Sequence, residues 1–179
     1  MFHPGRIKIA AISVLAVFVL GCLAVASGLR WNGTESFPVG LYLETGKRAH
    51  RGDLVFASVP DLPVFAMAKA RGYLNVAFSS TAHLLKRLVG LAGDRVTIDS
   101  SGVEVNGIRL ANSAPLPCDQ ARRPLQAYAL KDRVLGPGQV LLMSEYNPAS
   151  FDGRYFGPLP ATAIESVATP ILVLPSQNR

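Results

Sequence analysis

Residues 31–42 read WNGTESFPVGLY, and this stretch follows an apolar N-terminal segment. Ser36 stands two residues before Pro38 and four before Gly40. Proline fixes its own φ and favours an extended conformation in the residue before it, whereas glycine permits dihedrals that other residues resist. The stretch therefore predicts a constrained turn that holds the Ser36 hydroxyl outward. Taken alone, the pattern is more typical of an ordinary surface turn.

A lysine lies within a second apolar stretch, because residues 83–94 read HLLKRLVGLAGD and residues 83–90 have the composition of a strand. On a strand, Lys86 shares its face with Leu84 and Leu88, since alternate side chains point the same way. Desolvation by leucines lowers the pKa of a lysine, and a neutral amine can act as a base. The alternative is that Lys86 lays its stem on these leucines and keeps its ammonium group in water.

The three histidines do not favour a Ser-His-Asp site. His3 precedes the apolar segment, and His50 lies in a polar turn among basic residues. His83 is an odd number of residues from Lys86, so on a strand it faces the opposite side. A serine hydroxyl needs a base within hydrogen-bond reach, and a lysine is the remaining candidate for that base. Taken alone, Lys86 fits the alternative with a solvated ammonium group better.

The apolar segment itself, Ile9–Gly28, carries no charge and is long enough to span a bilayer. Arg6 and Lys8 precede it, which favours a cytoplasmic N-terminus. We expect a membrane anchor or signal segment over residues 1–29 and an exported domain over 30–179. Two processing alternatives remain open, namely cleavage after the small-x-small pattern of residues 24–26 and lipidation at Cys22.

Composition limits the partners. The formal net charge is +6, but no Lys/Arg-rich run is present, so we expect a domain beside an anionic bilayer and no nucleic-acid binding. Cys22 and Cys118 would lie on different sides of a membrane interface, so we expect no internal disulfide. Cys118 is expected to be a free or intermolecularly paired thiol and not a nucleophile. No cofactor and no metal are expected.

Short strands separated by turn signals predict a mainly-β body. One short helix is expected from Pro60-Asp61 to Gly72, and residues 111–125 read as a proline-rich loop. The apolar tail from Pro170 reads as broken by proline. The strands are expected at residues 41–43, 54–59, 83–90, 95–99, 103–107, 108–110, 128–134, 139–144 and 164–168.

The Ser36 stretch, the Lys86 stretch and a third block with Ser150, Asp152 and Arg154 together resemble the signal peptidase I clan of serine–lysine peptidases. The matching blocks run from residue 32 to about residue 165. The form Asn-x-Thr-x-Ser-x-Pro-x-Gly-Leu-Tyr is similar to the TraF-type peptidases of conjugative transfer systems. The chain departs from the clan at Ala92, where proline is frequent, and at Phe37, where many signal peptidases carry methionine.

The resemblance implies roles for the third block. Ser150 would orient the Lys86 amine, and Asp152 and Arg154 would form a supporting ion pair. A carboxylate near the amine would raise the pKa of Lys86, so Asp152 should lie nearer Arg154 than Lys86.

Acyl transfer also needs donors where the oxyanion develops. The Ser36 N–H is one candidate, and Thr34 matches the position from which some clan members supply a hydroxyl.

The expected protein is thus a signal-peptidase-like antiparallel β domain with an N-terminal transmembrane helix, placed in the inner membrane with a periplasmic catalytic domain. If the anchor is cleaved, it is periplasmic. By resemblance it cleaves an exported precursor after small side chains through an acyl-enzyme, the precursor being a conjugative pilin whose own amino terminus can close a ring. Contact with a conjugation apparatus is also implied. The alternatives are a general signal peptidase and a non-catalytic scaffold of a secretion channel.

Overall fold

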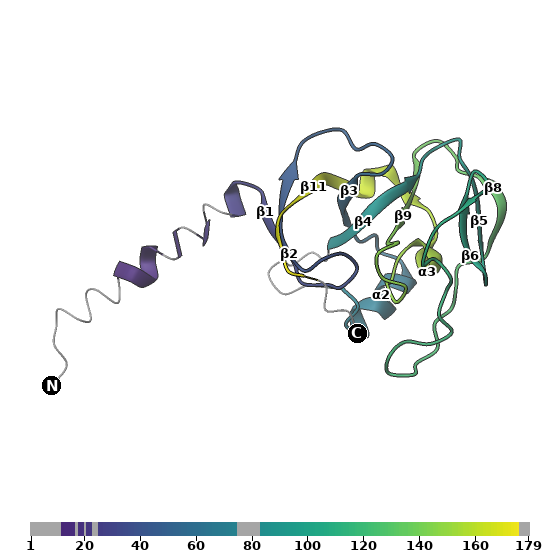
Figure 1. Ribbon diagram of the computed structural model, residues 1–179, viewed down its shortest axis with the longest axis horizontal. Coiled ribbons are helices and arrows are strands. Elements are labelled where there is room, and N and C mark those ends of the chain that lie inside the picture. The colour runs from purple at the N-terminus through teal and green to yellow at the C-terminus, as the bar shows by residue number, and fades with distance from the viewer. Residues whose placement is uncertain (1–11, 17, 20, 23–24, 75–82, 176–179) are drawn as a thin grey trace.

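The computed structural model describes residues 12–16, 18–19, 21–22, 25–74 and 83–175. The described residues before Leu29 extend away from one end of a β-rich body (Figure 1). The strands and helices of this body are β1 (Leu29–Asn32), β2 (Gly40–Thr45), β3 (Leu54–Ser58), α2 (Pro63–Ala70), β4 (His83–Gly90), β5 (Arg95–Asp99), β6 (Gly102–Val105), β7 (Ile108–Arg109), β8 (Leu130–Val134), β9 (Gln139–Met143), α3 (Gly153–Phe156), β10 (Leu159–Pro160), a 3₁₀ turn (Ala161–Ala163) and β11 (Ile164–Val173).

Two antiparallel sheets make up the body. The larger has the strand order β1-β2-β11-β3-β4-β9-β10, and the smaller has the order β7-β6-β5-β8. The described strands pair antiparallel throughout. The predicted mainly-β class is therefore confirmed, and strand β4 has the bounds that the sequence predicts.

Strand β4 lies inside the larger sheet between β3 and β9, and both of its faces are covered. Leu84 and Leu88 pack in one hydrophobic cluster, together with Phe65, Phe151 and other side chains. Leu85 packs on the opposite face in a second cluster with Phe37, Tyr42 and Phe56. A strand covered on both faces needs a nearly continuous apolar run, which explains why HLLKRLVG lacks a polar face. Lys86 therefore enters a fully packed environment.

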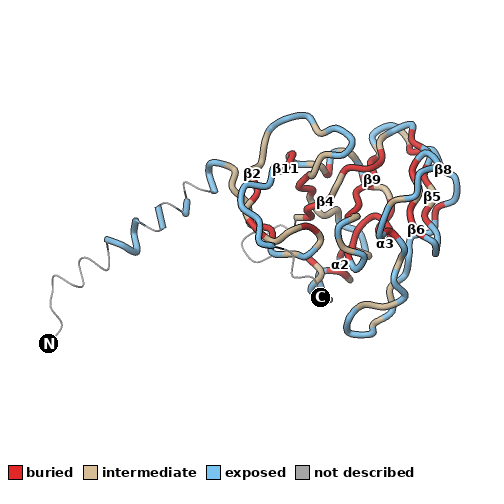
Figure 2. The backbone as a smooth tube through the Cα atoms, viewed as in Figure 1, coloured by how far each residue is buried: buried red, intermediate tan, exposed pale blue. Residues whose placement is uncertain are grey.

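A third cluster joins the two sheets. Val89, Leu141 and Met143 of the larger sheet pack against Val96, Ile98, Val103 and Val105 of the smaller sheet. Figure 2 shows the buried residues concentrated along β4 and β9 and on the inner side of β5 and β6. This packing places the start of the segment after β9 beside the middle of the sheet, where Lys86 lies.

Several elements differ from the sequence-based expectations. Helix α2 begins at Pro63, three residues later than Pro60, because proline suits the first turn of a helix. Strand β11 continues through Pro170 to Val173 with a register shift after the proline, so the predicted break is wrong. Gly40 lets β11 approach β2 closely. A Cβ added at this position would lie 2.2 Å from the Leu172 carbonyl oxygen, so a larger residue would not fit. The short elements β1 and α3 are not evident in the sequence pattern.

The predicted transmembrane helix over residues 9–28 lies in part outside the described residues. Among the residues that the structure does describe, no helix is long and apolar enough to cross a membrane. Cys22 and Cys118 are both free thiols.

Candidate active site

The predicted turn around Ser36 connects β1 to β2, and a single buried side chain organises it. Asn32, only 5% exposed, donates through Nδ2 to the carbonyl oxygens of Thr34, Phe37 and Pro38 at 3.0 to 3.2 Å. Its Oδ1 accepts the Thr34 N–H and the Thr34 hydroxyl. The turn is thus held by asparagine as well as by Pro38 and Gly40. Asparagine side chains commonly bond the backbone two residues further along the chain, so Asn32 is a residue type suited to this turn.

Lys86 reaches Ser36 from strand β4. Its Nζ lies 2.7 Å from Ser36 Oγ and 3.1 Å from Ser150 Oγ, and the two hydroxyl oxygens are 3.1 Å apart. The three side chains thus form a triangle of hydrogen bonds. The structure brings together the three residues that the sequence predicts as nucleophile, base and orienting hydroxyl, and it includes the expected contact between Ser150 and Lys86.

Lys86 is 2% exposed, and the alternative in which its ammonium group reaches water does not occur. Burial lowers the pKa of the Lys86 amine from 10.5 to about 8; the nearby Asp152 carboxylate acts in the raising direction and the Arg154 guanidinium in the lowering direction. Desolvation disfavours the charged form of an amine, so the neutral form becomes accessible near neutral pH. A neutral amine 2.7 Å from a hydroxyl can accept its proton.

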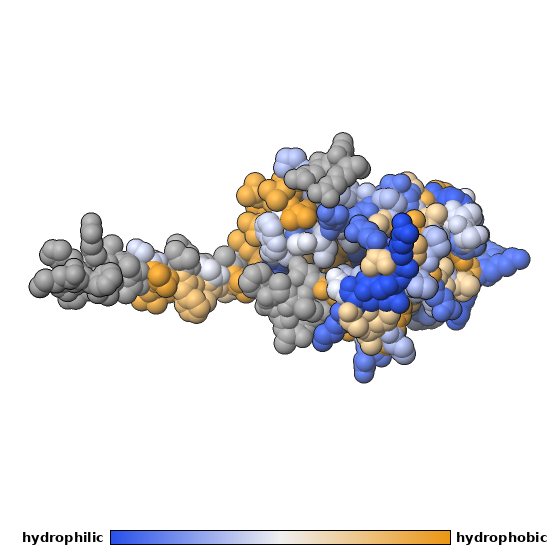
Figure 3. All heavy atoms as spheres, turned by 90° about the horizontal axis from the view of Figure 1, so that it is seen from below, coloured by the Kyte–Doolittle hydropathy of each residue, from blue (hydrophilic) through white to orange (hydrophobic). Residues whose placement is uncertain are grey.

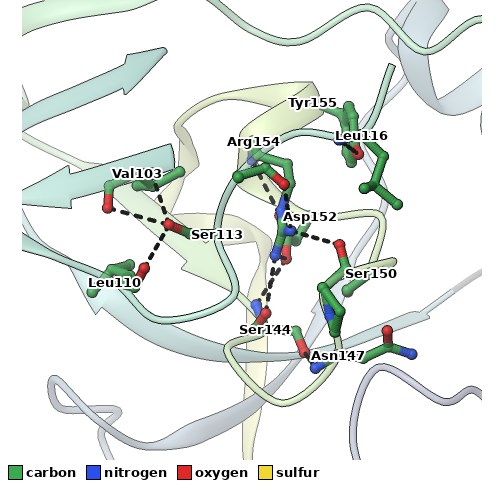
Figure 4. A network of polar contacts seen from close by, with 12 residues as sticks. Val103, Leu110, Ser113, Leu116, Ser144, Asn147, Ser150, Asp152, Arg154 and Tyr155 are labelled. Carbon is green, nitrogen blue, oxygen red and sulfur yellow. Dashed lines mark hydrogen bonds and ion pairs between the residues drawn. The ribbon is translucent and has the colours of Figure 1, made fainter. Parts of the chain in front are cut away.

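Asp152 and Arg154 form the expected ion pair, and both side chains are 0% exposed. Arg154 Nε and Nη2 donate to the two carboxylate oxygens at 2.8 and 2.9 Å. The remaining guanidinium hydrogens reach the carbonyl oxygens of Ala114, Pro148 and Ser144. Figure 4 shows Arg154 between Asp152 and Ser144. Buried charges are tolerated when they are paired and hydrogen-bonded, and this pair meets both conditions. It fixes the segment that carries Ser150.

The segment after β9 also contacts the Ser36 turn directly. The Ser144 hydroxyl donates to the Ser36 carbonyl oxygen, and Asn147 Nδ2 donates to the Glu35 carbonyl oxygen at 3.1 Å. The Tyr146 ring stacks on Phe37 with ring centroids 6.1 Å apart. The sequence pattern does not single out Ser144 or Asn147, because only the three-dimensional contact connects them to a turn more than 100 residues away.

The Thr34 hydroxyl is engaged within its own turn. It donates to Asn32 Oδ1 at 2.8 Å, so a role as oxyanion donor requires it to exchange this partner. The backbone N–H of Ser36 is the second candidate named by the sequence. This N–H shares a peptide unit with the Glu35 carbonyl, and Asn147 Nδ2 donates to that carbonyl oxygen.

The histidines contact other residues. His83 Nδ1 lies 2.7 Å from a carboxylate oxygen of Glu165, and His50 lies beside Asp53 in an exposed turn. His3 is outside the described residues. Within the described part of the chain, no group of three or more His, Cys, Asp or Glu residues is arranged to hold a metal ion.

The chain is similar to known proteins over most of its length. The signal peptidase model of peptidase S26 matches residues 5–173. Plasmid transfer protein TraF of Escherichia coli is 39% identical over 163 residues, which cover 90% of this chain and 92% of that protein. Conjugal transfer protein TraF of Agrobacterium tumefaciens (strain 15955) is 37% identical over 164 residues, which cover 87% of this chain and 90% of that protein.

A crystal structure of a signal peptidase I from Enterococcus faecalis V583 aligns with 20% identity and a TM-score of 0.39, covering 70% of this chain and 100% of that one. This alignment is too loose to add to the description of the site. The family match and the identity to the two transfer proteins, in contrast, each span most of the chain. They show that the chain belongs to the signal peptidase S26 family.

Proposed function

We propose that this protein is a serine endopeptidase in which Ser36 is the nucleophile and Lys86 the general base. The observation that carries the proposal is the 2.7 Å contact between Ser36 Oγ and the amine of a lysine that is 2% exposed. A solvated lysine amine stays protonated at neutral pH, whereas this amine has a pKa of about 8. Membership of a peptidase family supports the same reaction.

The geometry supports acyl transfer in two steps. Neutral Lys86 accepts the Ser36 proton as Oγ attacks the scissile carbonyl, and the protonated amine then donates a proton to the leaving nitrogen. The remaining acyl-enzyme is an ester on Ser36. Ser150 contacts both reacting groups and keeps the amine directed at Oγ. Asp152 and Arg154 do not touch the reacting atoms; they hold the segment that carries Ser150.

The substrate proposed is an exported precursor, specifically a conjugative pilin cleaved after a small side chain. Two relatives with 39% and 37% identity bear the names plasmid transfer protein and conjugal transfer protein, which supports a role in conjugation and contact with a conjugation apparatus. Water as acceptor releases a linear product. The pilin's own amino terminus as acceptor forms a new peptide bond and releases a cyclic product.

The protein is proposed to work at the inner membrane with its catalytic domain in the periplasm. The uncharged run of residues 9–28 and the basic residues before it support this orientation. Exposed apolar side chains also gather on the body where the N-terminal segment leaves it (Figure 3). Strands β1 and β11 both pair with β2, and their exposed large apolar side chains are Trp31, Ile171, Leu172 and Val173. Exposed apolar patches commonly mark membrane or protein contacts. Because the catalytic domain is proposed to lie in the periplasm, an alkaline phosphatase fused after Asn178 should be active.

Co-expression with candidate pilin precursors, followed by intact-mass analysis, tests the proposal. The expected result is a shortened pilin with the wild-type protein and an uncleaved precursor with Ser36→Ala or Lys86→Ala. A cyclic product is lighter than the hydrolysed one by the mass of one water. If Ser36→Ala supports normal processing and transfer, the non-catalytic scaffold is the better account. If the wild-type protein rescues cells depleted of signal peptidase, a general signal peptidase is favoured.

A further inference from the structure

Two peptide units flank the Cα atom of Ser36, and the segment after β9 anchors both of them. The carbonyl of the first unit belongs to Glu35 and accepts a hydrogen bond from Asn147 Nδ2 at 3.1 Å. The carbonyl of the second unit belongs to Ser36 and accepts a hydrogen bond from the Ser144 hydroxyl. With both flanking planes held, the φ and ψ angles of Ser36 are fixed from outside its own turn.

The first of these bonds has a consequence for the oxyanion. A peptide unit is planar and trans, so its C=O and its N–H point in opposite directions. The described residues contain no cis peptide bond. Because the Glu35 carbonyl and the Ser36 N–H belong to the same unit, the hydrogen bond from Asn147 also sets the direction of the Ser36 N–H.

Asn147 is itself held firmly. Its Oδ1 accepts the Ala149 N–H at 2.8 Å, which leaves Nδ2 directed at Glu35. Its carbonyl oxygen accepts the Ser150 N–H at 3.0 Å, so the turn that orients Asn147 also carries the hydroxyl that contacts Lys86. The same segment begins at Ser144, whose N–H donates to Asp152 and whose carbonyl accepts from Arg154.

We propose that Asn147 is a positioning residue for the oxyanion donor: its amide holds the Glu35–Ser36 peptide unit so that the Ser36 N–H faces the developing negative charge. The inference rests on the proposed acyl-transfer function. Removing one oxyanion donor outright typically lowers kcat about a hundred- to a thousandfold. Because the peptide unit would be released here and not deleted, a loss of about ten- to a hundredfold is expected.

If Asn147 only stabilised the segment after β9, any substitution that weakens this segment would lower kcat equally. Asn112 provides a matched control for this alternative. Asn112 Nδ2 donates to the Glu145 carbonyl oxygen at 2.9 Å, so it holds the same segment with the same kind of bond but does not touch the Ser36 turn. Asn147→Asp keeps an oxygen for the Ala149 N–H, loses the donor to Glu35 and adds a negative charge. Asn147→Ala loses both bonds without adding a charge. Asn112→Asp weakens the segment alone.

Steady-state kinetics on the full-length protein in detergent provide the first measurement. For Asn147→Asp and Asn147→Ala, kcat is expected to fall about ten- to a hundredfold while KM stays within about threefold, because the donor acts on the transition state. Asn112→Asp should retain kcat within about threefold. Unchanged kcat in both Asn147 variants, or an equal loss in Asn112→Asp, would overturn the inference.

Alkylation provides a readout that needs no oxyanion. In the Ser36→Cys background, reaction with iodoacetamide at position 36 is a displacement at a saturated carbon, so its rate reports the nucleophile and its base alone. Peptide mass mapping separates this site from Cys22 and Cys118. We expect the Asn147 variants to alkylate at close to the parent rate. A loss of alkylation as large as the loss of kcat would overturn the inference by placing the effect on the nucleophile. If the wild-type protein itself cleaves no precursor, the proposed function fails instead.

Discussion

The amine of Lys86 lies 2.7 Å from the hydroxyl of Ser36 inside a sheet that excludes water from the lysine. A protonated amine cannot accept the Ser36 proton, so kcat/KM should rise as pH increases through the folded pKa of Lys86. Burial places this pKa at about 8, with Asp152 opposing and Arg154 assisting the shift. Precursor cleavage measured between pH 6 and 10 should show a single rise in kcat/KM with its midpoint near pH 8.

The substitution Lys86→Arg separates base catalysis from a purely electrostatic role. Arginine keeps the positive charge but does not deprotonate in the working range, so it should be as inactive as Lys86→Met. Cleavage assays with circular dichroism as the folding check decide between the two roles. If a well-folded Lys86→Arg protein keeps substantial activity, and its kcat/KM does not rise with pH, then the positive charge and not a neutral amine is needed.

Lys86 should also reduce stability at neutral pH. Below pH 8 both the folded and the unfolded state are protonated, and the folded state carries the full cost of burying the charge. Between about 8 and 10.5 the folded state releases its proton first, so the free energy of unfolding rises with pH. Lys86→Met should therefore be more stable than wild type at pH 7 by roughly 3 kcal/mol, because lowering the pKa from 10.5 to about 8 costs about 1.4 kcal/mol per pKa unit. Urea unfolding at pH 7 and pH 10 should show this difference narrowing, and a constant difference would contradict it.

Ser150 should affect rate more than substrate binding. Ser150→Ala removes the hydroxyl that contacts both Lys86 and Ser36, and a misdirected base typically costs about ten- to a hundredfold in kcat. Ser150→Thr retains the hydroxyl and should recover part of the rate. Ser113 is a matched control, because its buried hydroxyl bonds Leu110 and Val103 away from the site. Ser113→Ala should lower stability without changing kcat of the folded protein; equal kinetic losses in both alanine variants would remove the special role of Ser150.

Local signals in the sequence predict the parts of the site that depend on neighbouring residues. Pro38 and Gly40 indicate the turn, and the leucines on either side of Lys86 along its face indicate a buried amine. Strand β4 is predicted at its observed bounds because its apolar run ends in glycine. The pairing of Ser36 with Lys86, in contrast, is proposed from the family resemblance, since no local pattern links residues 50 positions apart.

Contacts between distant segments account for what the sequence does not reveal. Asn147 and Ser144 act on the Ser36 turn only because β9 runs beside β4. Strand β11 continues past Pro170 because it pairs with β2, where the close approach at Gly40 is possible only without a side chain. Helix α3 has only four residues, and the Arg154 N–H in its first turn donates to Asp152, a residue that the family resemblance assigns to the ion pair.

Asp152 should influence both folding and the pH at which the enzyme works. Its carboxylate raises the pKa of Lys86, so Asp152→Asn should move the midpoint of the kcat/KM profile to lower pH. The same change leaves Arg154 buried with an unpaired charge, which typically destabilises a protein by about 3–5 kcal/mol. The pH profile must therefore be measured at a temperature where circular dichroism shows the variant to be folded.

Asp119→Asn provides the control for this last experiment, because Asp119 also pairs with an arginine, Arg123 at 2.6 Å, whereas the charges that shift the pKa of Lys86 are those of Asp152 and Arg154. It should leave the midpoint unchanged. A folded Asp152→Asn protein whose midpoint stays at the wild-type value would mean that the carboxylate only holds the Ser144–Ser150 segment in place. A midpoint that moves to higher pH would contradict the sign of the interaction, because loss of a negative charge cannot stabilise the ammonium form of Lys86.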